Sequence, residues 1–95
     1  MSARYHLTGQ ALSTAYVTLF QGSNGGGSDG ADMWGLEIWA TAGTATVKVN
    51  GNIIRTIGSG DTAHSFKFSK GTSDTINKVE AIGVSSATVL WCECM

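Results

Sequence analysis

The sequence predicts an all-β, single-domain protein: an antiparallel β-sandwich or jelly-roll-like barrel of about seven short strands. From Tyr16 onward, β-branched and aromatic residues alternate with polar residues at the two-residue period of half-buried strands. Breaks rich in Gly, Asn and Asp separate these runs, no segment has a helical period, and the chain contains no proline. Its 95 residues suit one domain.

The alternation places the strands in order along the chain. They are predicted at Ala15–Gln21, Trp34–Thr41, Thr44–Val49, Asn52–Ile57, Ala63–Ser69, Asn77–Ile82 and Ala87–Cys94. The sandwich domain is therefore assigned to residues 15–95. Residues 1–14 lack a strong pattern, and three interpretations stay open for them: a loose arm, a short added strand, or a segment that reaches onto another subunit.

The segment VKVNGNII carries the firmest local signal. Asn50 and Gly51 both tolerate positive φ, as the type I′ turn of a tight hairpin requires. The hairpin register predicts four cross-strand pairs: Val49 with Asn52, Lys48 with Ile53, Val47 with Ile54, and Thr46 with Arg55. Val47, Val49 and Ile54 then face the core. Ile53 and Ile57 lie on the opposite face.

Two further strands have faces that can be assigned. In WGLEIWAT the alternation turns Leu36 and Ile38 to the core and leaves Trp39 on the polar face. In the last predicted strand Leu90 and Trp91 face opposite ways, so both faces are apolar. Such a strand is either central in its sheet or covered on one side by a partner.

Composition excludes several functional classes. Six basic residues stand against seven acidic ones, a net charge of -1, and the basic residues are scattered, which predicts no nucleic-acid partner. No run reaches the length of a transmembrane span, and residues 1–12 lack the sections of a signal peptide. The charged fraction is 14%, against roughly 25% in an ordinary soluble domain. A surface so poor in charge suits burial against neighbouring chains.

The reduced cysteines and the short chain also favour stabilisation by neighbouring chains. A bridge between Cys92 and Cys94 would be strained, so reduced thiols and folding in a reducing cytoplasm are expected. A zinc site made of these two residues with His6 and His64 matches the usual paired ligand spacing poorly. Small domains without disulfides or metals usually gain support from neighbouring subunits.

The stretch QGSNGGGSDGADMWG, Gln21 to Gly35, holds six glycines and two aspartates. A phosphate-binding loop would need a following helix, whereas a strand follows here. Asp29 and Asp32 supply too few oxygens for calcium by themselves. A mobile hairpin tip, able to order on contact with a partner, is the favoured interpretation.

The segment GSGDTAHS gathers Ser59, Asp61, His64 and Ser65, which raises the possibility of a hydrolase. The spacing does not match a nucleophile elbow, and no second segment supplies an oxyanion hole. A turn that leads into a strand explains these residues better, with Asp61 bonding nearby backbone amides. We expect no enzymatic activity, no cofactor and no metal.

Four apolar residues are predicted to face away from the core and to bind a partner: Trp39, Ile53, Ile57 and Leu90. The alternative for Trp39 is a stacking platform for a sugar ring, with Asp29 and Asp32 completing the sugar site.

The order GLEIWATAGTATVKVNG, GSGDTAHSFKF and INKVEAIGVSSATVLW resembles the small β-sandwich structural proteins of tailed bacteriophage virions, over about two thirds of the chain. The resemblance implies a capsid decoration, or cement, protein on the outside of the head. Such proteins sit at junctions between major capsid subunits, commonly as homotrimers, and the resemblance implies no catalytic residue.

The expected function is therefore a non-enzymatic virion protein, assembled in the host cytoplasm, that clamps adjacent major capsid subunits. The alternative is a head-fibre or tail component that acts as a carbohydrate-binding module for receptor recognition.

Overall fold

The computed structural model describes residues 5–23, 26–27, 31–67 and 75–94, which fold as an all-β, single-domain antiparallel β-sandwich. The strands are β1 (Tyr5–Ala11), β2 (Val17–Gln21), β3 (Gly35–Val49), β4 (Asn52–Gly58), β5 (His64–Lys67) and β6 (Lys78–Cys94). This arrangement confirms the fold class that the alternation predicts. Among the described residues, no helix is long and apolar enough to cross a membrane.

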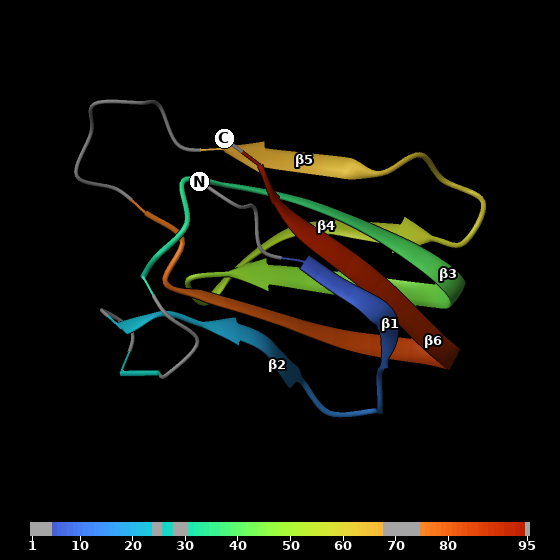
Figure 1. Ribbon diagram of the computed structural model, residues 1–95. Coiled ribbons are helices and arrows are strands. Elements are labelled where there is room, and N and C mark those ends of the chain that lie inside the picture. Colours follow the sequence, from blue (N-terminus) through green and yellow to red (C-terminus); the bar gives the residue numbers. More distant parts are fainter. Residues whose placement is uncertain (1–4, 24–25, 28–30, 68–74, 95) are drawn as a thin grey trace.

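Two long strands, β3 and β6, each join segments that the sequence divides in two. They pair from Gly35 opposite Cys94 to Val49 opposite Val79, with register shifts near the middle. Gly43 in β3 and Ser86 in β6 have positive φ there, 67° and 58°. The breaks predicted as turns are therefore corners inside continuous strands, and both strands turn back at the right of Figure 1.

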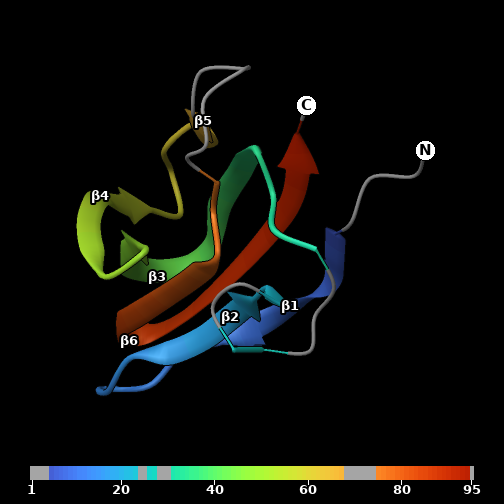
Figure 2. The same ribbon diagram turned by 90° about the vertical axis from the view of Figure 1, so that its left-hand side faces the viewer.

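The two corners fold one sheet into two layers. The first, called the β1–β5 layer, contains β1, the C-terminal half of β6, the N-terminal half of β3, and β5. The second, called the β2–β4 layer, contains β2, the other halves of β6 and β3, and β4. Figure 2 shows β4 and β5 on one side of the β3–β6 pair and β1 and β2 on the other.

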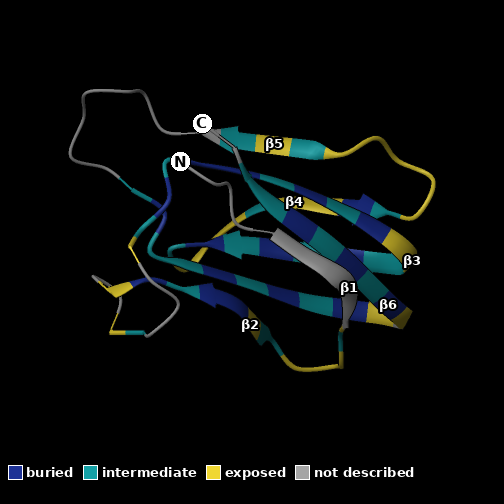
Figure 3. Ribbon diagram, in the orientation of Figure 1, coloured by how far each residue is buried: buried dark blue, intermediate teal, exposed yellow. Residues whose placement is uncertain are grey.

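The core lies between the layers. Buried residues alternate with more exposed ones along β3 and β6 (Figure 3). The phenyl ring of Phe20, from the β2–β4 layer, meets the indole of Trp91, from the β1–β5 layer, edge to face at 5.8 Å. The buried cluster comprises Leu19, Phe20, Met33, Leu36, Ile38, Ala40, Ala45, Val47, Val49, Ile57, Ile76, Val79, Ala81, Val89 and Trp91.

The β3–β4 hairpin contains a bulge that corrects part of the predicted register. Asn50 and Gly51 have φ of 52° and 85°, and the first two predicted pairs are present. Beyond them Val47 pairs with Arg55 instead of Ile54, so one residue of β4 is extra. An extra residue reverses the faces of everything that follows it.

Ile57 therefore lies in the core at 1% exposure, and the prediction that it faces away from the core is wrong. Ile53, which precedes the bulge, remains outside at 63% exposure.

The chain before β2 is built into the sheet. β1 pairs with β6 along residues 5–11, on the same edge of β6 that β2 uses further along. The amide of Leu12 donates to the carbonyl of Ala87, and the amide of Gly83 donates to the carbonyl of Ser13. The β1–β2 connection thus packs against the corner of β6.

The glycine-rich stretch does not close a hairpin, because β2 and β3 pair with opposite edges of β6 and not with each other. Its first residues are bound in place: the amide of Gly22 donates to the carbonyl of Asn77, and a Cβ on Gly22 would collide with the carboxylate of Asp32. The predicted mobile tip falls mainly on residues 24–25 and 28–30, which lie outside the described residues.

Candidate docking face

Trp39 and Leu90 lie next to each other on the outer surface of the β1–β5 layer. β3 and β6 place them directly opposite in register, and both are partly buried. The next pair along the same surface is Glu37 opposite Cys92, since every second residue of a strand faces the same way. We call these four residues the docking face.

The docking face carries one charged side chain. The hydroxyl of Ser65, on β5, donates to a carboxylate oxygen of Glu37 at 3.4 Å. The structure gives Glu37 no ion pair with a described cation. Burial, and to a lesser extent the charge of Glu37, raises the pKa of the Cys92 thiol. A neutral thiol in this place acts as a small apolar group and a poor nucleophile.

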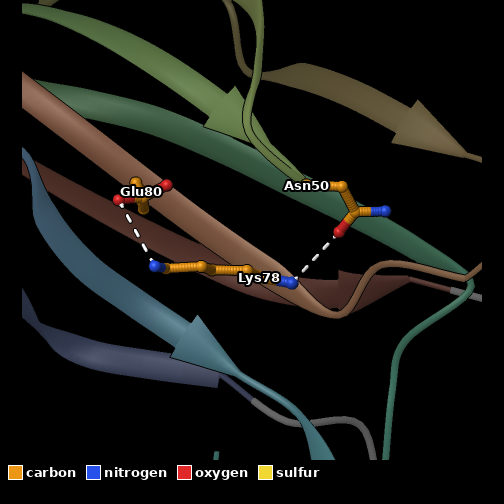
Figure 4. Close-up of polar contacts among 3 residues, drawn as sticks. All are labelled: Asn50, Lys78 and Glu80. Atoms are coloured by element: carbon orange, nitrogen blue, oxygen red, sulfur yellow. Dashed lines mark hydrogen bonds and ion pairs between the residues drawn. The ribbon is translucent and has the colours of Figure 1, made fainter. Parts of the chain in front are cut away.

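The outer surface of the β2–β4 layer is different, because its charges have partners. The ammonium of Lys48 lies 4.0 Å from the centre of the Tyr16 ring, and Lys48 is opposite Glu80 in register. Glu80 also forms an ion pair with Lys78, with 3.7 Å between its Oε2 and the Nζ of the lysine (Figure 4). A surface of mutually satisfied charges is suited to water.

The four residues predicted to bind a partner do not form one patch. Trp39 and Leu90 are neighbours, whereas Ile53 lies opposite Lys48, on the outer surface of the other layer. Ile57 is buried in the core. The register bulge explains the misplacement of Ile57, and the separation of Ile53 follows from the corner that divides β3 between the two layers.

Asn50 has a second structural role, in addition to its place in the turn, that the sequence does not reveal. The side chain of Asn50 binds the segment that leads into β6 (Figure 4). Its Oδ1 accepts from the amides of Asn77 and Lys78, at 2.9 and 3.1 Å, and its Nδ2 donates to the carbonyl of Thr75 at 2.9 Å. The turn signal of Asn-Gly was visible in the sequence. The latch was not, because its partners are 25 to 28 residues away.

The residues of the hypothetical hydrolase do not converge. His64 and Ser65 follow each other in β5 and so face opposite sides: His64 is opposite the buried Ile38, while Ser65 bonds Glu37 on the outer surface. The carboxylate of Asp61 accepts from the amide of Gly58 at 2.7 Å, as predicted for a turn. This arrangement supplies no relay from an acid through a histidine to a hydroxyl.

The predicted metal ligands are described only in part. Asp32 accepts a hydrogen bond from the hydroxyl of Thr75 at 2.8 Å, whereas Asp29 lies outside the described residues. Cys92 is a free thiol, and the side chains of Cys94 and His6 are not described. Within the described part of the chain, no three His, Cys, Asp or Glu side chains gather as a metal site.

Comparisons with known protein families, with curated proteins and with solved structures found no match to this chain. The site is therefore interpreted from its own chemistry.

Proposed function

We propose that the chain is a non-enzymatic bacteriophage virion protein, a capsid decoration protein that binds the shell through the docking face of its β1–β5 layer. The observation that carries the proposal is the adjacency of Trp39 and Leu90 on the docking face, where Glu37 is the one charged residue among the four. The sequence resemblance to small virion β-sandwich proteins supplies the class of partner, the major capsid subunits.

The energetics of the face fit a protein contact. Fully burying a large apolar side chain contributes roughly 1.5–3 kcal/mol, and Trp39 and Leu90 are only partly buried in the single chain. Because no more than about a third of either side chain is exposed, covering the rest contributes about 1–2 kcal/mol for the pair. Tryptophan is enriched among the residues that dominate binding energy, and a neutral Cys92 beside the pair adds no cost of desolvating a charge.

Glu37 adds a requirement on the partner. A carboxylate that loses its water on docking needs a replacement donor, because an unpaired buried charge is strongly unfavourable. The face thus fits a shell surface that offers apolar side chains beside one Lys or Arg. Several shell subunits bound in this way by a homo-oligomer would have to separate together under internal pressure, which is the clamping role.

The direct test is binding to particles that lack the protein. We expect the wild-type chain to bind them and to raise the temperature at which they open. Trp39→Ala should weaken binding by roughly 2 kcal/mol or more, about 30-fold, as for a hot-spot tryptophan. Ile53→Ala is the matched control, since Ile53 is exposed on the other layer and should leave binding unchanged. Particles equally stable with and without the chain would refute the proposal.

A second candidate rests on the position of Trp39. A partly exposed indole beside a carboxylate, on the flat surface of a sheet, also suits the stacking face and hydroxyl groups of a sugar. A glycan array, run with and without calcium, separates this receptor-binding role from capsid binding. A glycan signal that Trp39→Ala abolishes would favour the carbohydrate-binding module, and an empty array would exclude it.

A further inference from the structure

Arg55 and His64 are brought to the inner side of the two edge strands β4 and β5. Arg55 lies opposite the buried Val47, and His64 lies opposite the buried Ile38. Residues directly opposite in an antiparallel pair point to the same face, so both side chains leave their strands on the inner side, where Arg55 is exposed and His64 is partly buried. The bulge in β4 is what turns Arg55 inward, because the unbulged register would direct it to the outer surface.

The surroundings of the two side chains are apolar. Ile54 from β4 and Phe66 from β5 pack against the core, and Phe66 shares the inner face of β5 with His64. β4 and β5 each pair with β3 and with no other described strand, so both are edge strands of the described sheet.

The positive charge of Arg55 acts on the imidazole of His64. Burial, and then the positive charge of Arg55, lowers the pKa of His64. Of the described acids near these strands, Asp61 accepts from the amide of Gly58 and Glu37 lies on the outer surface of its layer, and neither forms a described ion pair with Arg55 or His64. The described cations Lys48 and Lys78 do have partners, an aromatic ring and Glu80.

We propose that Arg55 and His64 form a binding site for an oxyanion, a phosphate or a carboxylate, at the open edge between β4 and β5. The guanidinium offers two parallel N–H donors to the oxygens of such a group, and an imidazolium offers a third donor from the facing strand. The bound anion neutralises the repulsion that the free protein contains. This site is independent of the docking face, which lies on the outer surface of the β1–β5 layer.

The proposal links anion binding to protonation. Because His64 contributes a charge only when it is protonated, binding strengthens as the pH falls through its pKa, and by linkage the bound anion raises that pKa. NMR titration of the histidine ring in the full chain measures both effects, at about 0.15 M ionic strength to suppress non-specific attraction. His64→Gln assigns the signal, since His6 is the other histidine.

Inorganic phosphate and acetate are the two probes, and they distinguish the two oxyanions. Arg55→Gln should weaken binding of the effective probe at least about tenfold, from the loss of a charge-assisted hydrogen bond. Arg55→Lys keeps the charge but loses the two parallel N–H donors of the guanidinium, so its affinity for the probe should lie between those of the wild type and Arg55→Gln. The matched control is Lys78→Gln, which removes one positive charge from the outer surface of the β2–β4 layer, away from the site, and should change nothing.

Two results would overturn the proposal. One is a His64 signal whose titration is the same in chloride, phosphate and acetate. The other is an equal loss of binding in Lys78→Gln and Arg55→Gln, because attraction to net charge would then explain the effect without a site. The exposed position of Arg55 makes its replacement compatible with folding.

Discussion

The latch at Asn50 permits a prediction whose size follows from the structure. Replacing Asn50 by glycine keeps the positive φ of 52° accessible and removes three side-chain hydrogen bonds. At about 1 kcal/mol each, the loss is about 3 kcal/mol in the free energy of unfolding. Asn50→Ala loses the same bonds and adds the strain of a left-handed residue, about 1 kcal/mol more. A domain of 95 residues has roughly 5–14 kcal/mol in total.

Urea unfolding followed by tryptophan fluorescence measures these differences. Asn50→Asp is the informative intermediate, because a carboxylate retains both acceptor contacts with the amides of Asn77 and Lys78, whereas its second oxygen replaces the donor to Thr75 and repels that carbonyl. We expect the order wild type, Asp, Gly, Ala from most to least stable. An Asn50→Gly variant within about 0.5 kcal/mol of wild type, the usual range of surface substitutions, would refute the latch.

Three further predictions test other parts of the structure. Ile57→Ala should lower the free energy of unfolding by about 2–5 kcal/mol, whereas Ile53→Ala should change it by less than about 0.5 kcal/mol; equal effects would contradict the bulge. Gly43→Ala should destabilise by more than 2 kcal/mol in the same unfolding assay, because the new Cβ would lie 2.6 Å from the Val84 carbonyl oxygen at a φ of 67°. Alkylation of Cys92 by iodoacetamide at alkaline pH should be slower than that of an exposed thiol, and Glu37→Gln should speed it by lowering the pKa; an unchanged rate would exclude the influence of Glu37.

Side-chain alternation predicted most of the core. Leu36 and Ile38, Val47 and Val49, and Trp91 all lie on the buried faces assigned to them. These segments have one apolar and one polar face, or lie in the centre of the sheet, so the two-residue period leaves a single arrangement that buries their apolar atoms. The last strand is different: β6 is central in the sheet, yet pairing on its edges covers neither face, and its outer face with Leu90 belongs to the docking face.

Side-chain alternation does not predict the bulge in β4. The segment NIIRTIG offers isoleucine at three positions, Ile53, Ile54 and Ile57, and these cannot all fall on one face of a regular strand. Either register exposes one isoleucine near the turn. The contacts that go with the bulged register lie at the far end of the hairpin, where Thr44 pairs with Gly58 and the amide of Ser59 donates to the carbonyl of Gly43.

The corners in β3 and β6 cannot be predicted from the sequence for a related reason. Glycine and serine at a corner give the same signal as glycine and serine in a loop, because both need residues that accept positive φ. What distinguishes them is pairing across the break. Thr44 and Ala42 pair with Val84 and Thr88, so the strands continue through residues that resemble a turn. That information comes from residues about 40 positions apart, which no local pattern contains.

The distribution of charge over the two layers favours one surface for docking. Covering the outer surface of the β2–β4 layer would remove water from Lys48, which lies over the Tyr16 ring, and from the ion pair of Lys78 with Glu80. Covering the docking face removes water from a single carboxylate, Glu37. Because desolvation of each ion costs several kcal/mol unless a partner replaces the water, the docking face is covered at the lower cost. A partner with one well-placed cation then meets the whole of that cost, and the burial of Trp39 and Leu90 is left as the net gain.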